Sequence, residues 1–175
     1  MRKVLHILGD FSDEDIEWLI DFGSKRTVQP NTLLIKSDVQ LSEVYFVLSG
    51  KFIIELKDGT LIAKIKSGEI LGEMSFIEDE LPMVNVKAME LANVISISHE
   101  SINDRFKEIP DFAGRFYKAM SLFLSSRLRS VAAKVSYDNS LTKGSKEFEQ
   151  DIDNATLNRI QIAGERFSRL LSHFR

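Results

Sequence analysis

The most informative part of the sequence runs from Leu71 to Ala88 and reads Leu-Gly-Glu-Met-Ser-Phe-Ile-Glu-Asp-Glu-Leu-Pro-Met-Val-Asn-Val-Lys-Ala. Gly72 directly precedes a charged residue and a short helical stretch, and glycine readily takes the positive φ that a tight turn needs. Three consecutive acidic residues and Pro82 then lead into a strand-like run that begins at Val84. The stretch therefore predicts a turn, a short helix, an acidic loop and a strand.

Short strand-like runs, rich in β-branched and aromatic residues, lie on both sides of this stretch. They cover Thr32 to Ile35, Val44 to Leu48, Lys51 to Leu56, Thr60 to Ile65, Val84 to Ala88 and Val94 to Ile97. Turn residues separate them, namely Gly50, the hairpin pair Asp58-Gly59, Gly68 and Gly72, and the last two flank a further short strand. This punctuation predicts an antiparallel sandwich or barrel.

Helical periods flank the strands. The segment from Ser12 to Phe22 opens with a capping serine and predicts an amphipathic helix. The segment from Pro110 to Tyr137 predicts a long helix with one apolar face, because apolar residues recur every three or four positions. That face comprises Phe112, Phe116, Met120, Phe123, Leu124, Leu128, Val131 and Val135. A hinge is expected over residues 138–145, and a short apolar helix pattern follows it.

Composition excludes several classes of protein. The 175 residues carry a formal net charge of -3, no cysteine and three histidines that are far apart in sequence. Disulfide frameworks and thiolate metal sites are therefore excluded. The N-terminal apolar run is too short for a signal peptide, and no segment approaches the ~20 apolar residues of a membrane span. We expect a soluble, cytoplasmic protein without a membrane segment.

Motifs of catalysis are missing from the sequence. It contains no glycine-lysine loop of the Walker type, no nucleophile elbow and no metal-ligand spacing. An enzyme is therefore not expected.

The order and spacing of the motifs from Leu5 to Tyr137 are similar to those of the cyclic-nucleotide-binding domain family. This family is the β-roll shared by the catabolite activator protein, protein kinase A regulatory subunits and gated ion channels. The resemblance implies an α+β fold, in which an antiparallel, jelly-roll-like β-roll is flanked by an N-terminal helix and a long C-terminal helix. Residues 1–137 would form this domain. Residues 138–175 would form the hinge and a helical tail, for which a reduced helix-turn-helix is one interpretation.

The resemblance also assigns roles within the stretch from Leu71 to Ala88, which we call the cassette. In the family, a glutamate accepts a hydrogen bond from the ribose 2′-hydroxyl, backbone N–H groups face the cyclic phosphate and an arginine pairs with its charge. Glu73 matches the glutamate, and Gly72, Met74 and Ser75 match the backbone donors. The arginine position falls on Pro82 when counted from the glycine and on Met83 when counted from the proline. Neither side chain can pair with a phosphate.

Weak binding of cAMP or cGMP, or none, is the expected consequence. Losing a charge-assisted pair costs about 1.5 to 3 kcal/mol, roughly ten- to a hundredfold in affinity. The only nearby cation in the sequence is Lys87, which strand alternation places on the opposite face from Val86 and Ala88.

Two alternatives concern single cassette residues. Glu73 could serve only to stabilise the helix N-terminus. Met83 and Val84 are expected to fill the emptied pocket with apolar surface, and a pocket for a less anionic ligand is the alternative.

The tail is a basic island, with Arg159, Arg166, Arg169 and Arg175 against Glu165. The segment from Gly164 to Leu171 resembles the start of the recognition helix of catabolite-activator-type regulators. Glu165 and Arg169 match the two residues that read base edges there, with Arg166 beside them. Gly164 and Gln161 depart from the family pattern. A solvated face, or a packing or dimer helix, is the alternative.

Three hypotheses follow for the function. The chain is a ligand-sensing or signalling module with a weakened pocket, a transcription regulator that binds DNA through its tail, or a structural dimerisation module. A homodimer through the long helix of residues 110–137 is expected. No metal and no cofactor other than a weakly bound cyclic nucleotide is predicted.

Overall fold

The computed structural model describes residues 5–139 and 154–174 of the chain. Two short helices, α1 (Leu5–Asp10) and α2 (Asp13–Phe22), precede the strands β1 (Ser24–Val28), β2 (Leu33–Ile35), β3 (Glu43–Ser49), β4 (Lys51–Glu55), β5 (Leu61–Lys66) and β6 (Ile70–Leu71). They are followed by α3 (Glu73–Glu78), β7 (Asn85–Ala88), β8 (Ala92–Ser98), α4 (His99–Glu108), α5 (Pro110–Asn139) and α6 (Asn154–His173). The predicted strands and the long helix are confirmed, with bounds shifted by one or two residues.

Two antiparallel sheets form the β-roll, with strand orders β1-β8-β3-β6 and β2-β7-β4-β5. Alternate side chains of each strand point inward, as when Phe52 and Ile54 of β4 pair in register with Ala88 and Val86 of β7. All the strands contribute to the hydrophobic cluster that these inward side chains form. The predicted antiparallel two-layer β-roll is confirmed.

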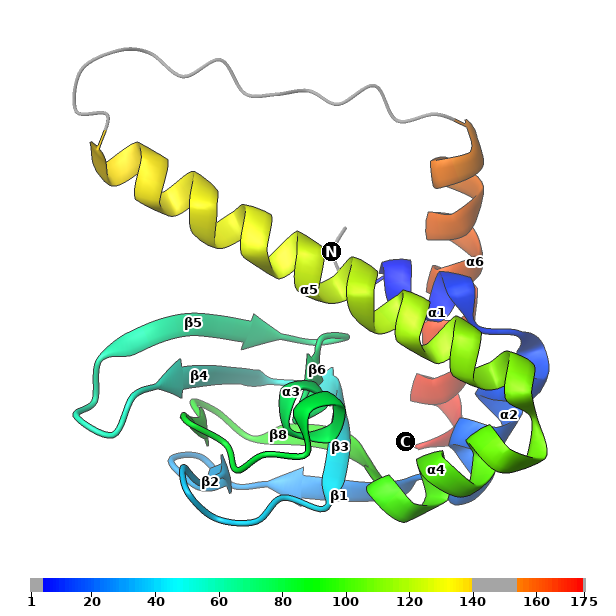
Figure 1. Cartoon of the computed structure of the whole chain (residues 1–175), viewed down its shortest axis with the longest axis horizontal. Coiled ribbons are helices and arrows are strands. Elements are labelled where there is room, and N and C mark those ends of the chain that lie inside the picture. Colours follow the sequence, from blue (N-terminus) through cyan, green and yellow to red (C-terminus); the bar gives the residue numbers. More distant parts are fainter. Residues whose placement is uncertain (1–4, 140–153, 175) are drawn as a thin grey trace.

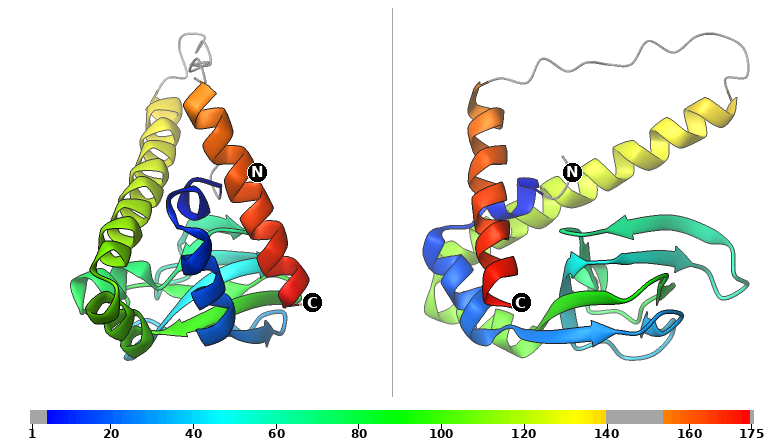
Figure 2. Two further views of the ribbon diagram at one scale, coloured as in Figure 1. Left: turned by 90° about the vertical axis from the view of Figure 1, so that its right-hand side faces the viewer. Right: turned by 180° about the vertical axis from the view of Figure 1, so that it is seen from behind.

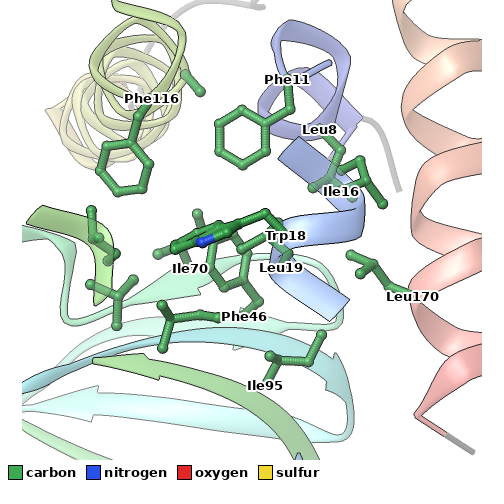
Figure 3. Packing of buried hydrophobic residues seen from close by; sticks show 14 of the residues in the cluster. Leu8, Phe11, Ile16, Trp18, Leu19, Phe46, Ile70, Ile95, Phe116 and Leu170 are labelled. Carbon is green, nitrogen blue, oxygen red and sulfur yellow. The ribbon is translucent and has the colours of Figure 1, made fainter. Parts of the chain in front are cut away.

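A second hydrophobic cluster lies between the helices and the outer face of the β3-β8 sheet (Figure 3). Aromatic rings dominate it. Phe116 of α5 lies 5.4 Å from Phe106, 5.6 Å from Phe76 and 6.2 Å from Phe11, measured between ring centroids. The helices gather at one end of the β-roll, and α5 runs from there back above it (Figure 1). The first apolar half of α5 thereby closes the β-roll.

The tail helix α6 belongs to this same cluster. Ala163, Leu170 and Phe174 are buried in it, and α6 lies beside α1 and α2 on the side away from α5 (Figure 2). A Cβ atom at Gly9 of α1 would lie only 3.1 Å from the carbonyl oxygen of Arg159, so glycine permits the two helices to approach. Of the interpretations given for the tail, the packing helix agrees with the position of α6 in the helical cluster. Most of the predicted hinge, residues 140–145, lies outside the described residues.

Three elements have no counterpart in the sequence predictions: the short helix α1, the strand β1 and the helix α4. The strand β1 is almost wholly exposed and pairs with β8, and its Ser24-Lys25-Arg26-Thr27 start lacks an alternating pattern. The helix α4 is mostly polar, and the Ser98 hydroxyl caps it by accepting from the N–H of Ser101 at 3.0 Å. Within residues 5–139 and 154–174, no helix combines the length and apolar character that crossing a bilayer requires.

A buried carboxylate joins α2 to α5. Asp15 is fully buried and exchanges capping hydrogen bonds with Ser12, whose hydroxyl accepts from the Asp15 N–H. Arg115 of α5 binds the same carboxylate through two atoms, with Nε 2.6 Å from Oδ2 and Nη2 2.9 Å from Oδ1. The pair fixes the angle at which the two helices meet.

Acid is expected to weaken this junction. Burial alone would raise the pKa of Asp15, but the hydrogen bonds from Arg115 and Ser12 outweigh burial and hold that pKa below its usual value. A depressed folded-state pKa adds stability that is present above the unfolded-state pKa and is lost as the pH falls through the folded-state value. Asp15→Asn should therefore flatten the acid side of the stability profile, measured as urea midpoints from neutral pH down to about pH 3. An unchanged acid slope in the variant would contradict this assignment.

Candidate ligand-binding cassette

Gly72 sets the geometry of the cassette. It has φ +85° and caps α3, and a Cβ atom there would lie 2.8 Å from the Glu43 carbonyl oxygen and 2.9 Å from Leu41 Cδ2. Only glycine satisfies both the backbone conformation and the space. At the other end of α3, Asp79 has φ +54°, a left-handed conformation that aspartate tolerates. The short predicted helix between a glycine turn and an acidic loop is therefore present.

Glu73 points inward from the first turn of α3 and is 3% exposed. Arg127 of α5 donates from Nη1 to Glu73 Oε1 at 2.6 Å, although the two residues are 54 positions apart. The same guanidinium donates from Nη2 to the Ile70 carbonyl at 3.3 Å and lies 4.5 Å from the Phe123 ring centroid. Burial raises the pKa of Glu73, and the positive charge of Arg127 opposes that rise. Glu73, which the resemblance matches to the ribose-binding glutamate, thus has a partner within its own chain.

The other predicted cassette residues divide between interior and surface. Ser75 is buried in α3, whereas Met74 is exposed. Pro82 is buried, and its carbonyl oxygen accepts from the Asp38 N–H at 2.8 Å. Met83 is 76% exposed, so the expectation that it fills an interior pocket is wrong. Val84 is half-buried and packs against the cluster between the sheets.

Neither candidate for the arginine position therefore supplies a cation to the interior. The side chain of Lys87 lies on the outer face of its sheet and pairs with Glu55 at 3.0 Å, as the strand alternation predicts. The view that Lys87 is the only nearby cation is wrong, because Arg127 reaches Glu73 from the long helix. Arg127 could have been found from the spacing of Phe116, Met120 and Phe123, since it occupies the next position on the same apolar stripe.

This set of groups limits the chemistry of the cassette. A carboxylate can accept a hydrogen bond from a sugar hydroxyl, but the guanidinium that could attract a phosphate is bound to that carboxylate. The described residues also contain no group of three or more histidine, cysteine, aspartate or glutamate side chains placed to hold a metal ion.

The predicted DNA-contacting residues lie on α6, along its contact with the N-terminal helices. Arg166 is 15% exposed and binds Asp13 through Nε at 3.0 Å and the Leu8 carbonyl through Nη1 at 2.9 Å. Arg169 is 45% exposed, donates to Glu17 at 2.6 Å and borders an open polar cleft of about 410 Å³. Glu165 is exposed and accepts from Gln161 at 3.1 Å. Arg166 and Arg169 thus both pair with carboxylates of α2, Arg166 largely buried and Arg169 partly exposed, while Glu165 faces solvent.

Comparison with known proteins agrees with the geometry. The sequence profile of the cyclic nucleotide-binding domain matches residues 25–108. An NTE family protein of Mycobacterium tuberculosis is 27% identical over 118 residues, which are 67% of this chain and 20% of that protein. The Pycsar effector protein XpPycTIR of Xanthomonas perforans is 27% identical over 119 residues, 67% of this chain and 39% of that protein. The chain therefore spans only a fifth to two fifths of the length of these relatives.

Solved structures share the fold. A cyclic nucleotide-binding domain from Methylobacillus flagellatus superposes with a TM-score of 0.68 at 20% identity, over 83% of this chain and 85% of that one. The catabolite activator protein of Thermus thermophilus superposes with a TM-score of 0.61 at 17% identity, over 95% and 85% of the two chains. Residues 25–108, with the β-roll strands and the glycine-glutamate turn, therefore match the cyclic nucleotide-binding domain in both sequence profile and fold.

Proposed function

We propose that this chain is a non-enzymatic regulatory module whose affinity for cyclic nucleotides is weakened or lost. The observation that carries the proposal is the buried pair of Glu73 and Arg127, together with the outward-facing Met83 at the arginine position. The carboxylate is already paired, and no cation from the cassette loop faces the phosphate position.

The electrostatics of the cassette loop favour the same conclusion. Glu78, Asp79 and Glu80 are exposed at the end of α3 and on the loop that follows, and they add negative charge to the cassette. A cyclic nucleotide would have to compete with Arg127 for Glu73, or bind without a charge partner for its phosphate. Either route removes about 1.5 to 3 kcal/mol of binding free energy relative to an intact cassette.

Thermal unfolding with added nucleotide tests the proposal. A ligand with a dissociation constant of ~1 mM stabilises a protein by about 0.4 kcal/mol at ~1 mM ligand, whereas a thousandfold tighter ligand would add about 4 kcal/mol. We expect cAMP and cGMP at this concentration to raise the melting temperature only slightly or not at all. A large shift that disappears in Glu73→Ala would refute a weakened cassette.

The relatives set the context of the module. Since the chain matches only part of the NTE family protein and of the Pycsar effector protein, we propose that it acts as a regulatory part rather than as a catalyst. The coverage of those proteins supports a modular role, in which the β-roll responds to a signal and α5 and α6 pass the response on.

Dimerisation through α5 is part of the proposal. Tyr117, Leu122 and Leu128 are exposed on this helix, and Leu128 is 70% exposed. Apolar side chains on a long helix favour pairing with a second copy. Leu128→Lys should shift the chain from dimer to monomer in sedimentation velocity, while Arg129→Ala on the same helix should not. A monomeric native chain, or a dimer that is unaffected by Leu128→Lys, would count against this interface.

A DNA-binding regulator is the second candidate. The observation that favours it is the exposure of Glu165 and Arg169 on α6, where Arg169 is 45% exposed beside its ion pair with Glu17, together with the similarity to the catabolite activator protein over 95% of the chain. Retardation of duplex DNA at low salt, lost in Arg169→Ala and weakened by added salt, would support it. Absence of retardation at low salt would exclude it.

A further inference from the structure

The outer face of the cassette carries apolar side chains that the fold leaves uncovered. Glu73 and Ser75 of α3 point inward, while Met74 and Ile77, three positions apart, are exposed on the other face of the helix. Leu81 and Met83 are exposed on the loop that follows. Figure 1 shows α3 lying outside the strands, below α5. The face of α3 opposite Glu73 and Ser75, with the loop that follows it, therefore carries exposed apolar side chains.

Val39 extends this apolar face onto a neighbouring loop. The Asp38 N–H donates to the Pro82 carbonyl at 2.8 Å, which brings exposed Val39 next to the turn that holds Leu81 and Met83. We call Val39, Met74, Ile77, Leu81 and Met83 the outer cassette patch. Single exposed apolar residues need no explanation, but a group from two adjoining segments is typical of an interaction site.

Acidic side chains border the patch. Glu78, Asp79 and Glu80 are consecutive and exposed, and none of them forms an ion pair within residues 5–139 and 154–174. The left-handed conformation of Asp79 fixes the turn that presents them. An apolar surface with an acidic edge is complementary to a segment that has an apolar stripe and basic flanks.

We propose that the outer cassette patch binds an amphipathic helix with a basic polar face, supplied by a partner protein. The two methionines suit this role, because their flexible side chains adapt to apolar helices of different shape. The chain's own basic helix is not the occupant, since α6 already packs its apolar residues against α1 and the helical cluster. A homodimer through α5 would use Leu128 and Tyr117, which lie on a different helix from the patch.

Docking there would act on the ligand site directly. Met74 follows Glu73 in the same six-residue helix, so a partner that shifts α3 also shifts the carboxylate bound to Arg127. If binding of the partner changes the affinity for a ligand that separates Glu73 from Arg127, then by linkage that ligand changes the affinity for the partner by the same factor. This step rests on the regulatory role proposed above, whereas the docking itself does not.

Fluorescence anisotropy with a defined peptide tests the docking. The probe is a labelled synthetic helix of leucine and lysine with leucines at helical spacing, and a scrambled peptide of the same composition is the control. We expect saturable binding of the helix by the full chain. Ile77→Asp and Met83→Asp should each weaken it by about tenfold or more. Leu91→Asp should not, although the exposure of Leu91 lies between those of Ile77 and Met83.

The charge arm uses a matched pair of variants. Glu78→Gln with Glu80→Gln should weaken binding and reduce its salt dependence, whereas Glu100→Gln with Glu108→Gln on exposed α4 should leave both unchanged. The proposal would be overturned if the scrambled peptide bound as tightly as the helical peptide. It would also be overturned if the control variants lost as much affinity as the patch variants. Conversion of a native dimer to a monomer by Met83→Asp would also overturn it, because the occupant would then be a second copy. If the native chain binds the peptide as expected and also binds cAMP tightly, the proposal of a weakened cassette is refuted and the proposal of a docking surface is supported.

Discussion

Arg127→Ala is expected to lower the free energy of unfolding by about 3 to 5 kcal/mol, because it leaves the Glu73 carboxylate buried without its partner. The variant also removes the hydrogen bond to the Ile70 carbonyl and the contact with the Phe123 ring. The remaining carboxylate must take up a proton or admit water, and both disturb the first turn of α3.

Urea unfolding of a small set of variants measures this effect. Arg129→Ala, two positions along the same helix, is the control, since Arg129 makes only an exposed 3.3 Å hydrogen bond to Ser125 among the described residues. The double variant Arg127→Leu with Glu73→Gln should regain much of the lost stability, because no charge is then buried alone. A loss in Arg127→Ala no greater than that in Arg129→Ala would show that the pair does not form.

Phe116→Ala is expected to cost about 3 to 5 kcal/mol in the free energy of unfolding. Phe116 is fully buried, and its ring lies within 6.2 Å of the rings of Phe11, Phe76, Phe106 and Phe112. Removing it leaves a cavity where the turn between α1 and α2 meets α3, α4 and α5, so these elements lose a common contact.

The control for this cavity is Phe22→Ala at the exposed end of α2. Phe22 stacks on Trp18 at 5.6 Å but is largely exposed, so its loss should cost no more than about 1 kcal/mol. Denaturant midpoints of the two variants, compared at equal slopes, give the two costs. Similar losses in both variants would place Phe116 outside the core.

Local sequence signals were sufficient for most of the fold. The strands β2 to β5, β7 and β8 have strong β-branched patterns, and positive φ at Gly50, Gly59, Gly68 and Gly72 matches the predicted turns. The strand β1 was not predicted because most of its residues are polar and its conformation comes from pairing with β8. The helix α4 was not predicted because Ile102 is its only buried residue, so it has no apolar stripe.

The cassette was only partly predictable. The prediction that Pro82 or Met83 stands at the position of the family's phosphate-binding arginine concerns single positions and rests on the resemblance alone. The ion pair of Glu73 and Arg127 could not, because it joins residues 54 positions apart. Strand alternation correctly placed Lys87 outside, but the outward turn of Met83 depends on how the loop after α3 packs on Asp38.

Placement of the tail likewise depended on tertiary packing. Its basic residues resembled a recognition helix, and α6 does form. Yet Arg166 binds Asp13 and the end of α1, contacts that no spacing in the sequence indicates. The contact between α1 and α6 depends on two small residues, Gly9 of α1 and Ala163 of α6. Their importance is visible only once the two helices are packed together.

A calorimetric titration of the chain with cAMP and cGMP up to millimolar concentration measures whether the cassette binds a cyclic nucleotide. We expect no saturable heat, or binding with a dissociation constant near the millimolar range, because Arg127 holds Glu73 and the cassette loop gives the phosphate no cation. Saturable micromolar binding that is abolished by Glu73→Ala would contradict this expectation, and would mean that the cassette binds its phosphate without a dedicated arginine.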